Sequence, residues 1–347
     1  MSTHPYPTAI DSIATLEEIM TRPSERLVAF MRELKGDLVI LGVGGKMGPS
    51  LAILAARAIE ASGVPRHITA VSTFSQPAVR ARLESHGIKL HRADVLASGA
   101  VDDLPLAENV LYMIGRKFGS SGAEWDTWAT NVHAAGLCAK HYTASRVVAF
   151  SSGNIYPFVD VDSGGATEMT APGPVGEYAM SGLGRERMWD YASHHFGTRV
   201  LHYRLNYAVE LRYGVLLDVA QKVWRGEAID VSMGYANCVW QGHANSVALQ
   251  CLGLASSPPS VINVTGLERV SIRSLAEDFG KAMGKPPKIV GNEMPTALLS
   301  NATRCHELFG PPEVSIETLF GWIVEWVMCG GETLSKPTHF ETRDGKF

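Results

Sequence analysis

A stretch near the start of the chain, from Asp37 to Gly48, constrains what this sequence can fold into more than any other. The apolar run at 38–41 predicts a buried parallel strand, and glycines follow at positions 42, 45 and 48 in the spacing G-x-x-G-x-x-G. Residues 49–59 then continue as a helical run. A strand, a glycine turn and a helix in this order form the context that a dinucleotide-binding fingerprint requires.

The glycine turn has a physical use in such a site. Glycines let the backbone turn tightly and approach a pyrophosphate, and the helix N-terminus offers unpaired N–H groups and a positive dipole end to that anion. A plain tight turn is the alternative interpretation, because a glycine pattern alone is weak. Both flanks favour a nucleotide site, in which we expect Gly42, Gly45, Lys46, Met47 and Gly48 to contact the cofactor.

The alternation of strand and helix continues beyond this turn. Further strands are predicted at 67–73, 88–93, 109–114, 146–151 and 198–204, with helices at 48–62, 77–86, 125–142 and 178–196. This order predicts an α/β fold with a doubly wound parallel (Rossmann) sheet and right-handed crossovers. We expect an N-terminal helical extension at 1–36, the dinucleotide-binding Rossmann domain at 37–205, and a smaller C-terminal substrate-binding lobe at 206–347 that is interleaved with it.

Bulk properties argue against other classes of function. The net charge of −4 disfavours a surface for nucleic acid or anionic membrane. No apolar run reaches the ~18 residues of a membrane span, and the first residues lack the pattern of a signal peptide. Five scattered cysteines without C-x-x-C indicate free thiols in a reducing cytosol, and no residues are spaced for a metal. We therefore expect a cytoplasmic protein that acts on a small molecule.

Several later segments follow the glycine turn in a recognisable order. They are Ala93-Asp94-Val95, Met113–Lys117, Asn131, Phe150–Pro157, Glu168 and Tyr178. Each is a weak signal by itself, but the ordered set is specific. Over about residues 37–328, the sequence resembles the extended short-chain dehydrogenase/reductases, the superfamily of NAD-dependent sugar epimerases and dehydratases.

This resemblance implies an NAD(P)-dependent enzyme in which a tyrosine hydroxyl exchanges a proton with a substrate alcohol or carbonyl. Tyr178 matches that catalytic tyrosine, and Ser152 matches the hydroxyl that hydrogen-bonds the same substrate oxygen. Lys117 matches a lysine that follows the fourth strand. The other implied cofactor contacts are Thr73, Asp94, Val95, Met113, Gly115 and Asn131, and the other implied substrate contacts are Asn154 and Asn206. A role for Asn206 as a strand cap is equally compatible with the sequence.

The family sequence Tyr-x-x-x-Lys reads Tyr178-Ala-Met-Ser-Gly182 here, so the lysine that lowers the pKa of the tyrosine is absent. A free tyrosine has a pKa near 10, and shifting it to about 7 requires roughly 4 kcal/mol from positive charge. We favour Lys117, at the carboxyl edge of the sheet, as the replacement. Arg185 is the second candidate, on the same helical stripe but about 10 Å along the axis. A solvated loop lysine is the alternative role for Lys117.

Gly182 is informative in its own right. A glycine inside a helix lowers the stability of the helix by ~1 kcal/mol relative to alanine. Its presence at position 182 therefore needs an explanation. Close packing of the helix is one explanation. Room for a ligand where the lysine would otherwise lie is the other.

The end of the second strand bears on the choice of cofactor. NAD-selective sheets usually carry an acid there, but residues 71–75 contain none, and their small hydroxyls leave space for a 2′-phosphate. Lys46, Arg80 or Arg82 could neutralise that phosphate. We therefore expect NAD(P), with a slight preference for NADP. Ordinary surface charge is the alternative role of these three cations.

The substrate anchors of the family are only partly present. Its nucleotide-sugar enzymes carry an arginine near 234–240 for the substrate pyrophosphate, whereas this chain has Ala236 at the matching position. Arg212 could instead hold a carboxylate or phosphate in a bidentate manner, or lie on the surface. We therefore predict an oxidoreductase or epimerase for the hydroxyl or keto carbon of a small sugar, sugar acid or related polyol. A nucleotide-sugar epimerase or dehydratase and a redox-inert NAD(P) sensor are the alternatives. The resemblance also implies a homodimer through helices 125–142 and 178–196.

Overall fold

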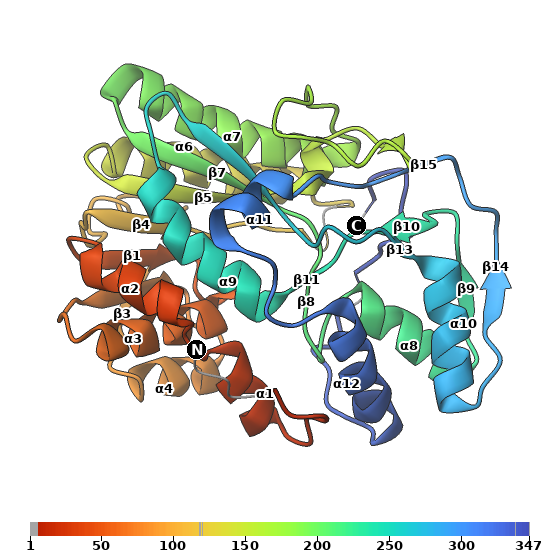
Figure 1. Cartoon of the computed structure of the whole chain (residues 1–347). Coiled ribbons are helices and arrows are strands. Elements are labelled where there is room, and N and C mark those ends of the chain that lie inside the picture. The colour runs from red at the N-terminus through yellow and green to blue at the C-terminus, as the bar shows by residue number, and fades with distance from the viewer. Residues whose placement is uncertain (1–5, 118, 120, 337, 347) are drawn as a thin grey trace.

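The computed structural model describes residues 6–117, 119, 121–336 and 338–346, and Figure 1 shows their arrangement. A central parallel sheet is covered by helices on both faces, and a smaller lobe of helices and short strands lies at one side. The predicted fold class is therefore confirmed. Residues 1–5, on which the signal-peptide expectation partly rests, lie outside the described residues.

Seven parallel strands form the central sheet in the order β12-β7-β5-β4-β1-β2-β3. Their bounds are Leu38–Leu41 for β1, Ile68–Ser72 for β2, Lys89–Arg92 for β3, Asn109–Tyr112 for β4, Arg146–Ser152 for β5, Arg199–Leu205 for β7 and Ser260–Val264 for β12. The strand order reverses between β1 and β4, and ligands of doubly wound folds bind outside the carboxyl ends of the strands at such a switch point. Because β12 belongs to this sheet, the chain returns from the lobe to complete it.

Both faces of the sheet are buried, which explains the continuous apolar strands in the sequence. Along β1, Leu38 and Ile40 belong to one core while Val39 and Leu41 belong to the other, as the period of two requires. The first core includes residues of α2 (Glu25–Glu33), α3 (Gly48–Ser62), α4 (Pro77–Glu84) and α9 (Gln241–Gln250), and the second includes residues of α6 (Ala134–His141) and α7 (Gly176–Phe196). Figure 1 shows α6 and α7 on one side of the sheet and α2, α3 and α4 on the other.

The helix predicted at 125–142 is not continuous. It consists of α5 (Glu124–Trp128), a π-helical turn η1 (Ala129–His133) and α6. Single π-helical turns inside α-helices frequently occur at functional sites. Asn131 lies in this turn with its side chain fully buried, and its contacts are part of the candidate site.

The smaller lobe has its own core. It is built from α1 (Ile13–Met20), α8 (Val215–Arg225), α10 (Ile272–Met283) and α12 (Ile316–Met328). The remaining elements are β6 (Val159–Asp160), β8 (Ala208–Val209), β9 (Ala228–Asp230), β10 (Tyr235–Ala236), β11 (Val239–Trp240), β13 (Val270–Ser271), β14 (Lys288–Val290), β15 (Thr296–Ala297), α11 (Thr303–Phe309), η2 (Gly153–Ile155) and η3 (Cys251–Leu254). Since α1 joins the core of the lobe and α2 joins a core of the sheet, the N-terminal helices connect the two parts. Within the described ranges, no helix combines the length and apolar character that crossing a membrane requires.

Candidate active site

The glycine turn between β1 and α3 needs glycine for two separate reasons. Gly42 has a φ of +83°, and a Cβ there would lie 2.7 Å from the backbone nitrogen of Ile114. A Cβ on Gly48 would lie 2.2 Å from the carbonyl oxygen of Val43. The first position requires a left-handed backbone, and the second requires close contact between α3 and the turn. The turn therefore brings bare backbone and the N-terminus of α3 to the edge of the sheet.

Substitution of Gly48 by alanine is expected to break this turn. The new methyl group meets backbone atoms of Val43 that cannot move without displacing the turn, which should cost about 1–3 kcal/mol of folding free energy. Affinity for NAD should fall as well. Thermal unfolding and NAD titration measure both effects. Gly321→Ala is the matched control, because open space surrounds Gly321 inside α12; that variant should keep its NAD affinity and be at least as stable as the unaltered protein.

Two cavities lie on either side of the turn, each of about 280 Å³, and Gly42 lines both. The first is lined by Gly45, Lys46, Met47, Gly48, Met113, Gly115, Lys117, Ser152, Asn154, Tyr178 and Asn206 together with residues that were not predicted. The second is lined by Thr73, Asp94 and Val95. The structure thus brings most of the predicted site residues to two cavities that share Gly42 of the glycine turn.

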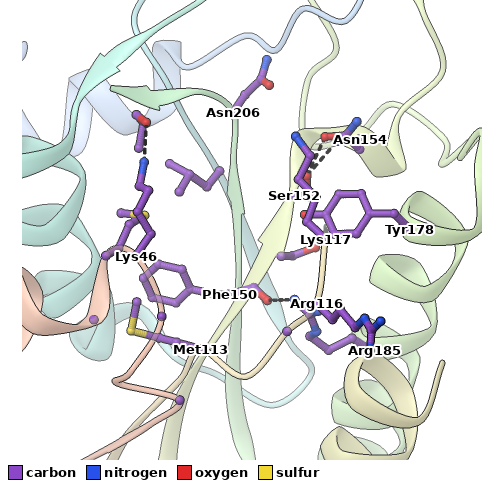
Figure 2. Close-up of a pocket in the computed structure, with 18 of the residues that line it drawn as sticks. Lys46, Met113, Arg116, Lys117, Phe150, Ser152, Asn154, Tyr178, Arg185 and Asn206 are labelled. Carbon is purple, nitrogen blue, oxygen red and sulfur yellow. Dashed lines mark hydrogen bonds between the residues drawn. The ribbon is translucent and has the colours of Figure 1, made fainter. Parts of the chain in front are cut away.

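Tyr178, Ser152 and Lys117 meet in the first cavity (Figure 2). The hydroxyl of Ser152, at the end of β5, donates to Oδ1 of Asn154 at 2.9 Å and accepts from the backbone N–H of Asn154 at 3.1 Å. Nζ of Lys117 lies 5.9 Å from the centroid of the Tyr178 ring and donates to the carbonyl oxygen of Thr338 at 3.1 Å. Burial lowers the pKa of Lys117 to about 8, so its charge is largely retained at neutral pH.

Arg185 lines this cavity, whereas Asn131, which was expected to contact the cofactor, is fully buried and is not among the lining residues. Asn131 Oδ1 accepts from the backbone N–H of Arg116 at 2.8 Å, and Asn131 Nδ2 donates to the carbonyl oxygen of Arg116 at 3.0 Å. These two hydrogen bonds connect the π-helical turn to the loop after β4. The Arg185 guanidinium donates to the carbonyl oxygen of Phe150 at 2.9 Å and to Asn131 Oδ1 at 2.6 Å. A Cβ on Gly115 would lie 2.6 Å from this guanidinium, which explains the glycine. Arg185 therefore reaches the cavity, and each of its three nitrogens already donates one hydrogen bond to Phe150 or Asn131.

No protein-family model and no curated protein matches the sequence. Solved structures do match. UDP-glucose 4-epimerase from Thermotoga maritima with UDP-glucose has a TM-score of 0.68 at 14% identity, covering 85% of this chain and 99% of that chain. UDP-glucuronic acid 4-epimerase from Bacillus cereus with NAD has 0.68 at 14%, covering 84% and 99%. The dTDP-glucose 4,6-dehydratase from Streptomyces venezuelae with NAD bound has 0.69 at 16%, covering 84% and 97%. The chain has the fold of these enzymes. The resemblance inferred from the sequence is thus confirmed at the level of the fold.

Gly182 is not explained by close helix packing. A Cβ there would meet only Cγ2 of Ile155, at an ordinary contact distance of 3.5 Å. The close approach in α7 occurs instead at Gly184, where a Cβ would lie 2.8 Å from Cγ2 of Val132. Gly182 is buried and does not line the first cavity. Close helix packing is therefore incorrect as the reason for Gly182, and room for a ligand is not supported at a position that does not line the cavity.

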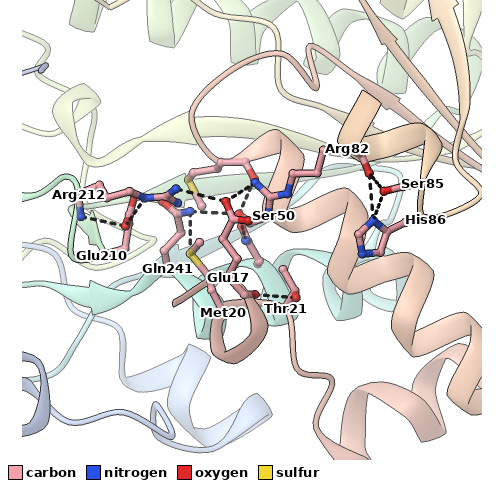
Figure 3. Close-up of polar contacts among 12 residues, drawn as sticks. Glu17, Met20, Thr21, Ser50, Arg82, Ser85, His86, Glu210, Arg212 and Gln241 are labelled. Carbon is pink, nitrogen blue, oxygen red and sulfur yellow. Dashed lines mark hydrogen bonds and ion pairs between the residues drawn. The ribbon is translucent and has the colours of Figure 1, made fainter. Parts of the chain in front are cut away.

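Four predicted anion-binding residues lie elsewhere than expected. The Arg212 guanidinium is bound by Glu210 at 3.1 Å and Glu17 at 3.3 Å, and Arg212 is not among the residues that line the first cavity (Figure 3). Arg82 pairs with Glu17 at 2.5 Å, and Arg80 pairs with Glu84 at 3.2 Å. Lys46 extends into the first cavity and not toward Thr73 in the second. Thus none of the three cations proposed for a 2′-phosphate lines the second cavity.

Two further tyrosines line the first cavity, and the sequence did not indicate either of them as a site residue. Tyr207 follows Asn206 directly after β7 and has a φ of +44°, an uncommon backbone conformation for a residue with a bulky side chain. Tyr213 lies in the loop before α8, and its ring centroid is 3.8 Å from Nζ of Lys46. No local sequence pattern indicates that a tyrosine will adopt the left-handed backbone conformation. The contact between Tyr213 and a residue of the glycine turn depends on how the lobe packs on the sheet.

Proposed function

We propose that this protein is an NAD(P)-dependent oxidoreductase or epimerase that acts on the hydroxyl or keto carbon of a small sugar, sugar acid or related polyol. The observation that carries the proposal is the convergence of Tyr178, Ser152 and Lys117 on one cavity beside the glycine turn. The turn supports a dinucleotide site, because Gly42 and Gly48 allow the tight backbone path that brings the N-terminus of α3 to the edge where a pyrophosphate would bind.

Each residue has a defined role in this proposal. A bound nicotinamide supplies hydride chemistry at the substrate carbon. Tyr178 Oη removes the proton of the substrate hydroxyl as the carbon is oxidised, and returns it in the reverse reaction. Ser152 Oγ would exchange its hydrogen bond to Asn154 Oδ1 for one to the same substrate oxygen. Lys117 places a positive charge 5.9 Å from the centroid of the Tyr178 ring and takes the part of the absent lysine.

The second cavity would hold the adenosine half of the cofactor, with Asp94 and Val95 beside the base and Thr73 near the ribose. The three cations invoked for a 2′-phosphate have other partners or face the other cavity. The solved structures of similar fold hold NAD. We therefore place NAD ahead of NADP.

A nucleotide-sugar epimerase or dehydratase is the second candidate, and the similar structures favour it, because they include enzymes solved with UDP-glucose. Against it stands Ala236, a buried residue of β10 at the position where an arginine would hold the substrate pyrophosphate. A redox-inert NAD(P) sensor is the third candidate and follows from the missing lysine.

One assay tests the proposal against both alternatives. The purified protein is first analysed for bound dinucleotide, and is then mixed with NAD or NADP and with matched pairs of free and UDP-linked sugars. We expect a change in reduced-nicotinamide absorbance, or sugar interconversion, with free sugars or sugar acids. Turnover of UDP-linked sugars alone selects the second candidate. Dinucleotide binding without turnover selects the sensor, and the absence of any dinucleotide affinity contradicts all three.

We also propose a cytoplasmic homodimer. Large apolar side chains are exposed on α5 and α7, with Trp125 at 69% and Tyr191 at 53% of their maximum exposure. Tyrosine and tryptophan are enriched at protein–protein interfaces, and α5 and α7 pack against each other. The contact would use the same pair of helices that the family resemblance implies.

A further inference from the structure

Lys46 belongs to the glycine turn, but its side chain crosses into the first cavity. Nζ donates to the carbonyl oxygen of Ala208 at 3.0 Å and lies 3.8 Å from the centroid of the Tyr213 ring. Figure 2 shows Lys46 on one side of the cavity and Ser152 with Tyr178 on the other. The ammonium therefore lies on the wall opposite the proposed catalytic hydroxyls, beside the segment that leads from β7 into the smaller lobe.

This ammonium is short of acceptors. A lysine has three N–H donors, and among the described residues Lys46 makes a single hydrogen bond, to a backbone carbonyl. It has no carboxylate within 4.0 Å in the described part of the chain; Glu210 is the acid whose charge acts most on it, and both oxygens of Glu210 bind Arg212. An ammonium in a desolvated site is costly without a counter-charge. An anionic ligand would supply that charge.

The cavity as a whole points to the same ligand chemistry. The charged residues among the described residues that line it are Lys46, Arg116, Lys117 and Arg185, and none of the lining residues is an acid. Arg116 pairs with Asp126 at 3.1 Å, and Arg185 is bound by Phe150 and Asn131. On the wall of the cavity opposite Tyr178, Lys46 is therefore a cation with two N–H donors that no described residue binds.

We infer that Lys46 binds the carboxylate of the substrate, which makes the substrate a sugar acid and not a neutral sugar or polyol. This inference rests on the proposed function and narrows it. With the carboxylate held at Lys46, the chain of hydroxyl-bearing carbons would extend across the cavity toward Ser152 and Tyr178. A cofactor phosphate is the other source of negative charge. A 2′-phosphate is disfavoured because the side chain is directed to Ala208 and Tyr213, away from the compartment lined by Thr73 and Asp94. The pyrophosphate at the glycine turn is distinguished from a substrate carboxylate by the NAD affinity of the Lys46 variant, which the test below measures.

The pH dependence of acid binding provides a second measurement of the role of Lys46. Burial lowers the pKa of Lys46 to about 7. The charges of Glu210 and Asp218 act to raise this pKa, and those of Lys117 and Arg212 act to lower it. The ring of Tyr213 lies beside the ammonium. A bound carboxylate favours the ammonium, so the pKa rises on binding. Acid binding should therefore be strongest below about pH 7 and should weaken as the pH rises above it. A role that is only structural would produce no such profile.

The test compares Lys46→Met with the unaltered protein, both saturated with NAD. The probes are D-glucuronate, D-gluconate and D-galacturonate, each paired with its uncharged counterpart D-glucose, D-glucitol or D-galactose, and binding is measured by calorimetry. At least one acid should bind the unaltered protein more tightly than its neutral partner. Lys46→Met should weaken that binding about 10- to 100-fold, the value of a charge-assisted hydrogen bond, and should remove the pH dependence. Lys281→Met, at an exposed ion pair in α10, is the control and should change nothing.

Three outcomes overturn the inference. In the first, Lys46→Met and the unaltered protein bind the acids equally well. In the second, Lys46→Met loses as much affinity for NAD as for the acids. In the third, the unaltered protein binds no acid more tightly than its neutral partner. Failure of the proposed function looks different, because acids would then bind in a manner that depends on Lys46 but would not be oxidised or epimerised. Methionine has nearly the same length as lysine and carries no charge into the cavity, so the variant should fold, and its unfolding temperature confirms this.

Discussion

Replacement of Tyr178 by phenylalanine should lower turnover about 10²–10⁴-fold while leaving NAD affinity and stability nearly unchanged. The substitution removes only the hydroxyl that exchanges the proton with the substrate. The ring stays in place in the cavity beside Lys117, whose ammonium lies 5.9 Å from the ring centroid. The rate of change in reduced-nicotinamide absorbance under saturating cofactor measures the effect, and calorimetric titration of NAD measures the affinity.

Tyr191→Phe is the matched control for this experiment. Tyr191 lies on the same helix, α7, and is 53% exposed, so loss of its hydroxyl should not affect turnover. Turnover by Tyr178→Phe at the rate of the control would contradict the assignment of Tyr178 as the acid/base. Loss of NAD affinity to the same degree as turnover would show that the hydroxyl serves the cofactor and not the proton transfer.

The fold was predictable because its signals are local. The apolar run of β1 alternates between two cores, and a strand that is buried on both faces must be apolar throughout. Gly42 and Gly48 are required by contacts that lie within the turn or beside it. The strand and helix order then fixes the edge at which ligands bind. Ser152 ends β5 at that edge, and it lines the first cavity together with Tyr178 of α7.

The long cationic side chains were not predictable in the same way. Arg212 was a candidate anchor, but it binds Glu17, which is 195 positions away in the sequence and arrives on α1 through the packing of the N-terminal helices (Figure 3). Lys46 sits in the expected turn, yet the direction of its side chain depends on Ala208 and Tyr213. A lysine or arginine reaches several ångströms in any of many rotamers. Its partner is therefore decided by tertiary structure that the sequence pattern does not contain.

A buried polar network beneath the site is the second feature with a large expected effect. Glu186 on α7 and Arg204 on β7 are 1% and 6% exposed, and two hydrogen bonds of 2.9 and 2.7 Å join them. Arg204 also donates to Tyr156 Oη at 2.7 Å, and that hydroxyl donates to Asn263 Oδ1 at 2.8 Å. The network therefore connects the helix that carries Tyr178 with three segments at the carboxyl edge of the sheet.

Glu186→Gln should destabilise the protein by about 3–5 kcal/mol at neutral pH, because it leaves the Arg204 charge buried without its counter-charge. The pH dependence has a defined sign. Burial acts to raise the pKa of Glu186, but His202 and the hydrogen bond from Arg204 outweigh it and hold the pKa below its ordinary value of 4.5. The stabilisation is therefore present above pH 4.5 and is lost as the pH falls through the lower folded-state pKa. The difference between the two proteins should shrink on acidification.

Denaturant unfolding at several pH values measures this difference, and Glu277→Gln, at an exposed position on α10, is the control. The control should match the unaltered protein at every pH. A loss in Glu186→Gln no larger than that of the control would mean that the Arg204 charge is satisfied by Tyr156 alone. A large loss that does not change with pH would point to packing and not to the ion pair. Because the network spans α7, β7 and β12, the destabilised protein should also lose NAD-dependent turnover at temperatures where Tyr178→Phe remains folded.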